Sequence, residues 1–240
     1  MIVDSESGSG CEDPRFHGRR RGRKLRSGQE RLLKDYLPKL RVDLADEDSP
    51  VDPIRLFPAG TEEVWLEIGF GAGEHLVWQA SANPRVGMIG AEPYLNGVAR
   101  LLAAIEVDCP DNVRILADDV RPMLQCLSDS SLSRVFILFP DPWPKQRHHR
   151  RRIINRTLLD TLARLMRDGA ELRVATDDQN YLVWILRHLK AHPDFAWTAA
   201  RSDDWRRRPA DWPNTRYEDK NRSGGPGPTF LRYLRCPRWG

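Results

Sequence analysis

The sequence predicts a Rossmann-like α/β fold, with a mostly parallel sheet, helices on both faces and an antiparallel edge strand. Short apolar runs alternate with segments of helical periodicity along most of the 240 residues, as in doubly wound folds. One run ends in a glycine-rich turn. Another, residues 134–139, is continuously apolar after Arg134, as expected for a strand buried on both faces at the centre of a parallel sheet. A last strand at 229–234 is expected to pair antiparallel at the sheet edge.

The N-terminal quarter of the chain differs in composition from the rest. Its first residues are rich in Ser, Gly and Arg and poor in large apolar side chains, so they cannot bury enough surface to offset the entropy of ordering. Leucines at helical spacing in 25–40 predict a short basic helix that ends at Pro38, and residues 43–58 predict a linker. We therefore expect a basic, largely flexible extension and linker over 1–58 and the folded domain over 59–240.

Strands and helices are expected to alternate in the folded domain. Strands are apolar runs bounded by polar residues or glycine, and helices carry apolar residues three or four positions apart. The expected strands span 64–68, 86–91, 113–117, 134–139, 171–176, 195–198 and 229–234. The expected helices follow the glycine turn and span 96–106, 153–166 (closed by Gly169) and 181–189, while 202–214 is expected to be an irregular loop.

The glycine turn is the first candidate ligand site. The strand at 64–68 is followed by Gly69, Gly71 and Gly73, and then at once by an amphipathic segment. Glycines supply positive φ angles and allow a ligand to approach the backbone closely. A plain strand-to-helix turn needs only one glycine, so three favour a ligand-binding turn.

The spacing of this turn differs from a pyrophosphate-binding fingerprint. That fingerprint places its third glycine three residues after the second, where this chain has Glu74 or Leu76. Glu74 would also put a carboxylate at the helix N-terminus, where a phosphate would bind. The turn therefore suits a nucleoside without phosphates. Glu67, just before the turn, suits a cationic ligand such as S-adenosylmethionine, which carries an ammonium and a sulfonium group.

Acidic residues follow the next two expected strands. Glu92 lies about 20 residues beyond the turn, the distance at which doubly wound folds bring an acid to ribose hydroxyls. An exposed loop glutamate is the alternative. Asp118 and Asp119 follow the strand at 113–117 and could receive the exocyclic amine of adenine. A polar strand end explains the pair nearly as well, and which of the two contacts the ligand stays open.

The loop after residues 134–139 displays one acid and one large aromatic side chain. It reads Pro140-Asp-Pro-Trp-Pro-Lys145, and its three prolines fix a rigid, non-helical conformation around Asp141 and Trp143. An aromatic plane beside a carboxylate suits a stacked nucleobase whose edge the carboxylate reads. A purely structural loop seldom needs both groups.

Charge is concentrated in two basic stretches. The net charge is only +4, but nine Lys and Arg residues and a single acid, Glu30, lie between Arg15 and Lys34. A second stretch runs from Lys145 to Arg156 with His148 and His149 within it. Each stretch alone would suit a solvated surface, but two beside a nucleoside-binding turn favour a nucleic acid partner. Removal of residues 1–26 is expected to weaken RNA binding and to leave methyl-donor binding unchanged.

Other features of the composition exclude several classes of protein. The four cysteines are scattered without metal-ligand spacing, so neither a zinc site nor a disulfide framework is expected. No apolar run approaches the roughly 18 residues that span a bilayer, and no secretory signal precedes the domain. We expect a cytoplasmic protein without a metal, either monomer or homodimer.

The motifs together resemble the bacterial tRNA (guanine-N7-)-methyltransferase family of class I S-adenosylmethionine-dependent enzymes. The resemblance covers roughly residues 20 to 235. It rests on Glu-Ile-Gly-Phe-Gly-Ala-Gly at 67–73, on Phe139-Pro-Asp-Pro-Trp-Pro-Lys145 with the basic run after it, on Ala175-Thr-Asp177 and on Thr215-Arg-Tyr-Glu218. It implies methyl transfer from S-adenosylmethionine to N7 of guanine 46 in the tRNA variable loop.

The resemblance also implies roles for particular residues. The methyl donor would contact Glu67, Glu92, Asp118 or Asp119, and Asp141, together with the glycines at 69, 71 and 73. The tRNA would contact Lys145, Asp177, Thr215, Arg216, Tyr217 and Glu218. The family commonly has Lys and Phe where this chain has Arg216 and Tyr217, which preserve charge and aromaticity. The segment before about Arg15 has no counterpart in the family.

The chemistry of the acceptor agrees with the acids around the expected site. N7 of guanine has a lone pair and no proton, so its methylation needs alignment and electrostatics more than a general base. Asp141 is therefore expected to act catalytically through orientation and charge. Three alternatives remain: a methyltransferase for another RNA acceptor atom, a nicotinamide-dependent oxidoreductase with a basic RNA-binding tail, and a non-catalytic RNA-binding module.

Overall fold

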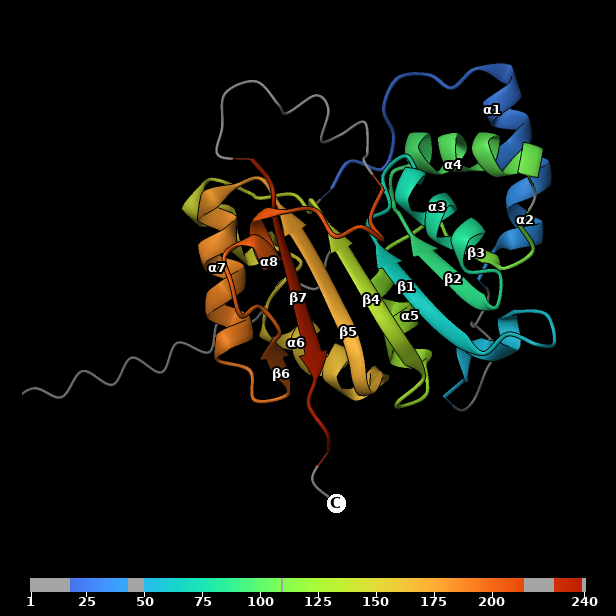
Figure 1. Cartoon of the computed structure of the whole chain (residues 1–240). Coiled ribbons are helices and arrows are strands. Elements are labelled where there is room, and N and C mark those ends of the chain that lie inside the picture. The colour runs from blue at the N-terminus through green and yellow to red at the C-terminus, as the bar shows by residue number, and fades with distance from the viewer. Residues whose placement is uncertain (1–17, 43–49, 109, 214–226, 239–240) are drawn as a thin grey trace, which may run out of the picture.

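A computed structural model describes residues 18–42, 50–108, 110–213 and 227–238, and its centre is one mixed sheet. The strand order is β3-β2-β1-β4-β5-β7-β6 (Figure 1). The strands are β1 (Glu63–Ile68), β2 (Val86–Ala91), β3 (Val113–Leu116), β4 (Leu132–Leu138), β5 (Met166–Thr176), β6 (Phe195–Trp197) and β7 (Thr229–Arg235). The predicted α/β class is confirmed.

Strands β1 to β5 are parallel, and β7 runs antiparallel to both of its neighbours. The sequence placed this antiparallel strand at the sheet edge, but it is second from the edge. Six residue pairs join β7 to β5, and the short β6 pairs with the far side of β7. The carboxyl ends of β1, β2, β4 and β5 therefore meet at one end of the sheet, where ligands bind in open parallel sheets.

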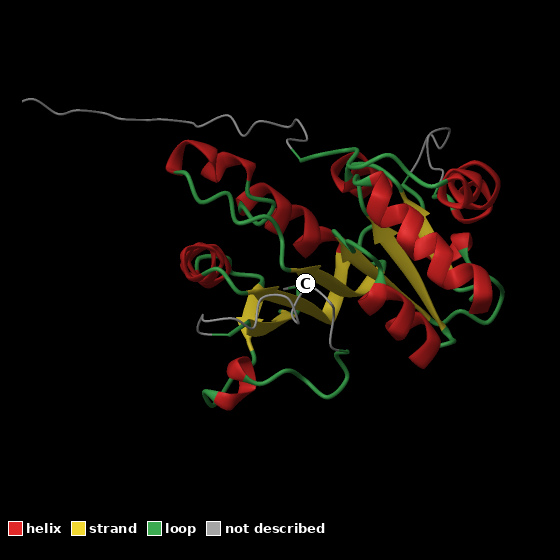
Figure 2. Cartoon of the chain, turned by 90° about the horizontal axis from the view of Figure 1, so that it is seen from above, coloured by secondary structure: helices red, strands yellow, loops and turns green. Residues whose placement is uncertain are grey.

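Helices cover both faces of the sheet (Figure 2). The helices of the domain are α3 (Glu74–Ala82), α4 (Leu95–Asp108), α5 (Val120–Cys126), α6 (Arg156–Leu165), α7 (Gln179–Lys190) and α8 (Asp203–Arg206). One apolar cluster joins the sheet to α5, α6 and α7, and the other joins it to α3 and α4. The alternation of side chains along β1 shows the division, because Leu66 belongs to the first cluster and Trp65 to the second.

The described part of the N-terminal region packs against the domain. It contains α1 (Ser27–Arg31), a π-helical turn (Leu32–Tyr36) and α2 (Leu37–Leu40), and the chain bridges to β3 at Arg41. Leu32 and Leu40 are 3% and 7% exposed and join the cluster under α4. These leucines attach residues 18–42 to the sheet, whereas a domain boundary near residue 58 stays a prediction.

Several expected boundaries were wrong for physical reasons. The basic helix does not end at Pro38, because Pro38 is the second residue of α2, where its missing N–H is not needed. Gly169 lies inside β5 with φ +77° and does not close α6, which ends at Leu165. Helix α5 was not expected, although Asp119 caps it by accepting the Arg121 N–H.

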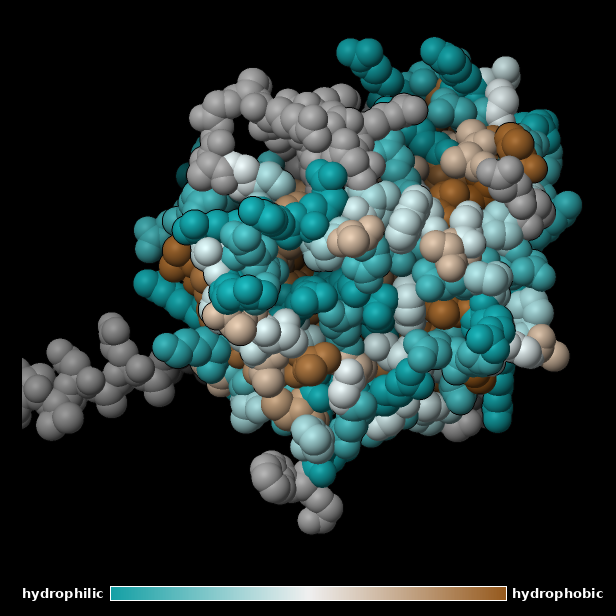
Figure 3. Space-filling view, viewed as in Figure 1, coloured by the Kyte–Doolittle hydropathy of each residue, from teal (hydrophilic) through white to brown (hydrophobic). Residues whose placement is uncertain are grey.

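Hydrophilic residues cover most of the face seen in Figure 1, and hydrophobic residues form small separate patches on it (Figure 3). In the ranges described above, no helix combines the length and the apolar character needed to cross a bilayer.

Candidate active site

The glycine turn has the backbone conformation that the sequence predicts. Gly69, Gly71 and Gly73 have φ angles of +78°, +59° and +82°, all in the region that side chains rarely adopt. A Cβ added at Gly69 or Gly71 would meet no atom within 4 Å, so both glycines leave open space on their free side. A Cβ at Gly73 would lie 2.5 Å from the Leu101 side chain. Two glycines thus give room for a ligand, and the third allows α4 to pack closely.

Glu92 follows β2 and holds the glycine turn in place. Its carboxylate accepts the N–H of Gly71 at 2.8 Å and the N–H of Tyr94 at 2.9 Å, and the residue is 8% exposed. Burial raises the pKa of this carboxyl, while the two backbone N–H groups oppose the rise. Because a carboxylate has about four acceptor positions, two remain for ligand hydroxyls.

The acids at 118 and 119 have different partners. Asp119 caps α5 and forms an ion pair with Arg121 at 2.6 Å. Asp118 accepts the Asp119 N–H at 2.7 Å and pairs with Arg20 at 2.7 Å, which keeps its pKa low against the opposing effect of burial. Both acids line the same cavity, so which of the two would contact a ligand stays a prediction.

The N-terminal arm, residues 18–23, forms part of this site, which the sequence did not suggest. Gly18 and Arg19 line the cavity, and Arg20 adds the ion pair to Asp118. The Asn96 side chain accepts the N–H of Gly22 at 2.8 Å and donates to the carbonyl of Arg23 at 2.7 Å. The arm is therefore docked at the start of α4, beside the end of the cavity that Asp118 lines.

The loop after β4 contains two strained residues. Phe139 and Trp143 have φ angles of +50° and +44°, which cost bulky side chains on the order of 1–3 kcal/mol each. The Phe139 N–H donates to the carbonyl of Ala175 at 2.8 Å. Strain of this kind persists only where the surroundings enforce it, and it is concentrated at functional sites.

Arg152 enforces the conformation of this loop from behind. It is only 1% exposed, its Nε donates to the carbonyl of Pro142 at 2.8 Å, and its Nη2 donates to Asn180 Oδ1 at 2.6 Å. Its guanidinium also lies 4.9 Å from the Tyr181 ring centre and 5.0 Å from that of Trp184. No local feature of the basic run indicates that this one of its arginines is buried.

Asp141 and Trp143 face the cavity from this loop. Asp141 is exposed, but the protein atoms around it desolvate its carboxyl and raise its pKa. The Arg151 guanidinium lies 5.0 Å from the Trp143 ring centre, and the His148 ring meets it edge-on at 5.9 Å. Desolvation, and then the cations Arg151 and Arg147, lower the pKa of His148.

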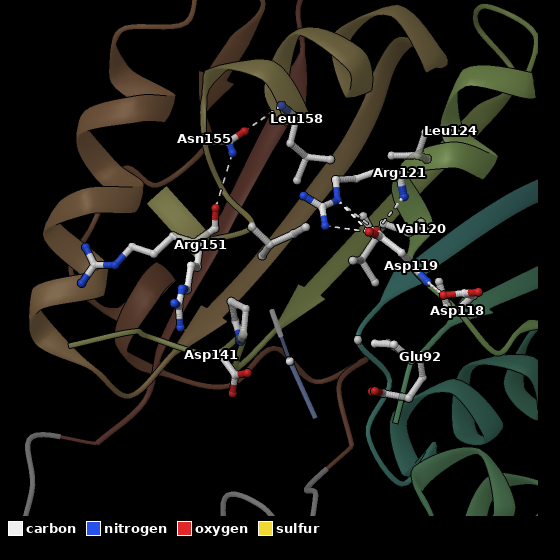
Figure 4. A pocket seen from close by; sticks show the side chains of 18 of the residues that line it. Glu92, Asp118, Asp119, Val120, Arg121, Leu124, Asp141, Arg151, Asn155 and Leu158 are labelled. Atoms are coloured by element: carbon white, nitrogen blue, oxygen red, sulfur yellow. Dashed lines mark hydrogen bonds and ion pairs between the residues drawn. The ribbon is translucent and has the colours of Figure 1, made fainter. Parts of the chain in front are cut away.

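One cavity of about 860 Å³ connects these groups. In Figure 4, Glu92, Asp118 and Asp119 lie on one side of it, and Asp141 and Arg151 lie on the other. Three acids thus line one end, where Arg20 and Arg121 pair with Asp118 and Asp119, and Asp141 lies with Arg151 at the other. Its lining includes Gly18, Arg19, Ile68, Gly69, Gly71, Glu92, Tyr94, Asp118, Asp119, Arg121, Phe139, Asp141, Trp143, Arg150, Arg151 and Arg152.

Glu67 does not line the cavity, contrary to what its place in the motif suggests. It lies behind the turn, 2% exposed, and its Oε2 is 2.7 Å from Nδ1 of His75. Its charge still reaches the site, because it contributes with Asp141 to the raised pKa of Glu92. Contact between Glu67 and the methyl donor stays a prediction, and the sequence analysis missed its partner His75.

The expected tRNA-binding residues are only partly placed. Lys145 is exposed at the end of the strained loop, and Asp177 is half-buried directly after β5, so both lie at the carboxyl end of the sheet. Residues 215–218 lie outside the described residues. Among the side chains that the structure describes, no group of three His, Cys, Asp or Glu is arranged to hold a metal ion.

The sheet order, the glycine turn after β1 and the acids after β2 and β3 define a class I methyltransferase, for which S-adenosylmethionine is the methyl donor. The residues fit that molecule, because the open glycines and the carboxylates suit a cationic nucleoside. A family model described as a putative methyltransferase matches residues 61–229.

Relatives define the family more closely. The tRNA (guanine-N(7)-)-methyltransferase of Rhodospirillum rubrum is 52% identical over 229 residues, covering 95% of this chain and 90% of that protein. That of Paramagnetospirillum magneticum is 48% identical over 240 residues, covering 99% and 100%. The chain belongs to the tRNA (guanine-N(7)-)-methyltransferase family.

A solved structure shows a similar fold. It is a mutant of the 16S rRNA (adenine(1408)-N(1))-methyltransferase from Catenulisporales acidiphilia, with a TM-score of 0.50 and 15% identity over 83% of this chain and 99% of that one. At this identity the likeness concerns the fold alone.

Proposed function

We propose that the protein transfers a methyl group from S-adenosylmethionine to N7 of guanine 46 in the variable loop of tRNA. The observation that carries the proposal is one cavity that brings Glu92, Asp118 and Asp119 together with Asp141, Trp143 and Arg151. Its carboxylates suit a cationic methyl donor, and the arginines near Trp143 suit RNA phosphates. Similarity to tRNA (guanine-N(7)-)-methyltransferases over nearly the whole chain supports this acceptor.

The methyl donor would be held by the residues after β1, β2 and β3. Glu92 has two acceptor positions left for ribose hydroxyls, and Asp118 or Asp119 would receive the adenine amine. Open space at Gly69 and Gly71 admits the ligand to the backbone. When bound, S-adenosylmethionine supplies an electrophilic methyl group on its sulfonium.

The acceptor base would lie at the loop after β4. Trp143 offers an aromatic plane, and Arg151 and the exposed Lys145 offer charges for phosphates. The N7 lone pair forms the new bond to the methyl carbon, and the electron pair of the broken carbon–sulfur bond stays on sulfur. No proton moves, so Asp141 would orient the base and stabilise its new positive charge.

Incubation of the protein with labelled S-adenosylmethionine and unmodified total tRNA, followed by nucleoside analysis, tests this proposal. Label in 7-methylguanosine is the expected result, and a transcript in which guanine 46 is replaced by adenine should take up none. Label in a different nucleoside would identify another RNA acceptor atom. Absence of label, with retained donor binding, would favour a non-catalytic RNA-binding role.

A tRNA substrate also places the proposed activity in the cytoplasm. The oligomeric state, monomer or homodimer, stays a prediction, which sedimentation of the purified protein would decide.

A further inference from the structure

Three buried polar side chains form a chain of hydrogen bonds behind the glycine turn. Glu67, His75 and Gln79 are 2%, 2% and 1% exposed. His75 Nδ1 lies 2.7 Å from Glu67 Oε2, and His75 Nε2 lies 3.1 Å from Gln79 Nε2. Gln79 Nε2 also donates to the carbonyl oxygen of Asp211 at 2.8 Å. This polar chain links the end of β1 to a segment far away in the sequence.

The hydrogen bonds of the polar chain have a single direction. The Asp211 carbonyl can only accept, so the Gln79 amide nitrogen donates to it. The other proton of that nitrogen points to His75 Nε2, which must then accept. This network assigns the imidazole proton to Nδ1, and Nδ1–H is donated to the Glu67 carboxylate. Each group therefore fixes the orientation of the next.

The surroundings of the polar chain are apolar. The His75 ring meets the Phe136 ring edge-on at 4.7 Å, and it lies 5.9 Å from the ring of Trp212. Polar groups in such a place cost free energy unless every one is paired, and well-packed apolar residues are often as stable. Packing alone does not explain three paired polar residues here, so their role is expected at the two ends of the polar chain.

One end of the polar chain holds the acid beside the glycine turn, and the other holds residues 211–212. Besides the bond from Gln79, the Asp211 carboxylate pairs with Arg173 of β5 at 2.7 Å. Trp212 is 2% exposed and packs edge-on against Phe230 of β7 at 5.2 Å. Residues 211–212 are thus fixed between α3 and the strands β5 and β7. They therefore give the Gln79 amide a fixed acceptor.

We propose that His75 and Gln79 are positioning residues of the methyl-donor site. His75 orients the Glu67 carboxylate, and Gln79 holds the His75 ring with Nδ1–H toward that carboxylate. The Asp211 carbonyl fixes the Gln79 amide in turn. The inference rests on the proposed function, because it assigns Glu67 to the methyl donor.

Two substitutions of His75 separate the two ends of the polar chain. In His75→Asn, the amide nitrogen stands where Nδ1 was and still donates to Glu67, but nothing reaches Gln79. In His75→Gln, the amide oxygen stands where Nε2 was and still accepts from Gln79, but Glu67 loses its donor. A buried hydrogen bond to a charged group corresponds to about tenfold or more in affinity.

We therefore expect the two variants to differ in one constant. His75→Gln should raise the calorimetric Kd for S-adenosylmethionine about tenfold, because Glu67 loses its donor. His75→Asn should leave that Kd within about twofold, because its amide still donates to Glu67, and both variants should leave KM for tRNA within about twofold. Gln79→Met removes the bonds to Asp211, His75 Nε2 and Asn83, so the ring loses one partner and Kd should rise less than in His75→Gln.

Asn112→Leu is the matched control. Asn112 is also a buried amide that donates to carbonyls around the end of α3, those of Ala80, Asn83 and Val86, and none of these bonds reaches the polar chain. Asn112→Leu should lower Tm and leave the Kd for S-adenosylmethionine unchanged. An equal change of that Kd in the two His75 variants, or an unchanged Kd in both, would overturn the inference.

The failure of the inference differs from that of the proposed function. If the wild-type protein forms no 7-methylguanosine in tRNA, the proposed function fails. The effect of His75→Gln on the Kd for S-adenosylmethionine is measured without tRNA and still decides the inference.

Discussion

The carboxylate of Glu92 accepts the backbone N–H of Gly71 at 2.8 Å, so the acid that ends β2 also holds the turn that follows β1. Its other oxygen accepts the N–H of Tyr94 at 2.9 Å, at the entry to α4. One side chain therefore joins three consecutive parts of the fold at the place where the methyl donor is proposed to bind.

Glu92→Gln is expected to weaken binding of S-adenosylmethionine by about 2 kcal/mol, near 30-fold, because charge-assisted hydrogen bonds to the turn and to the ribose are lost. Calorimetry measures this change. Glu62→Gln is the control, since Glu62 is an exposed glutamate paired only with Arg85 at the opposite end of β1. An unchanged Kd for the Glu92 variant would show that this acid only supports the turn.

Gly97→Ala is expected to destabilise the protein by about 1–3 kcal/mol, because a Cβ at this position would lie 2.2 Å from the carbonyl oxygen of Gly71. The turn would have to move, so affinity for S-adenosylmethionine should fall with Tm. Gly28→Ala, in α1, meets no atom within 4 Å and should leave both unchanged. Equal melting curves for the two variants would contradict the close approach of α4 to the turn.

Asp141→Asn is expected to slow methyl transfer by about 2–4 kcal/mol of barrier, because it keeps the shape of the side chain and removes its charge. Single-turnover kinetics measure the rate, and wild-type speed would exclude an electrostatic role. The rate should show no tenfold rise per pH unit through neutrality, since N7 carries no proton to remove. Affinity for tRNA should change much less than the rate.

The same variant should be slightly more stable than the wild type. Desolvation raises the folded-state pKa of Asp141 above its unfolded-state pKa, which is near 4. Ionisation of Asp141 therefore lowers the free energy of unfolding as pH rises through the folded-state pKa, and it has no effect below the unfolded-state pKa. At pH 7 Asp141→Asn should raise Tm by about 1 °C, a small gain because the side chain is exposed and solvent screens it. At about pH 3 the two melting temperatures should coincide.

Deletion of residues 1–26 is expected to weaken binding of both substrates. Each lost phosphate contact should lower the log–log salt slope of tRNA binding by roughly 0.7 to 0.9. Contrary to the sequence-based expectation, affinity for S-adenosylmethionine should also fall, because Gly18 and Arg19 line the cavity and Arg20 pairs with Asp118. Arg55→Ala, at a residue that is not part of the cavity lining, controls for loss of charge. An unchanged Kd for S-adenosylmethionine would show that the arm is not a wall of that site.

The sequence predicted the strands well because their signals are local. The run at 134–139 is continuously apolar after Arg134, and β4 (Leu132–Leu138) is buried along most of its length. The glycine turn could also be predicted from the sequence, since only glycine adopts its three positive φ angles without strain. Acids directly after strands could be assigned to one end of the sheet because parallel strands share a direction.

Long-range partners could not be predicted in the same way. Nothing in the local pattern distinguishes His75 from other polar residues of a half-buried helix. Its hydrogen bonds to Glu67 and Gln79 can be identified only in the folded structure. Arg152 lies in a run of arginines that looks solvated, yet it is buried behind the strained loop. The docking of Arg20 on Asp118 likewise joins residues that are far apart in the sequence.

The position of β7 has a consequence for how the protein is made. Residues 229–235 form a strand between β5 and β6, and β6 has no other strand partner in the described part of the chain. During synthesis, the hydrogen-bonding edge of β5 stays uncovered until residue 235 has left the ribosome. An uncovered edge is a template for pairing with other chains. Nascent chains that stall shortly before this strand should therefore be prone to aggregate, although every residue of the cavity lining, which ends at Thr161, has already been synthesised.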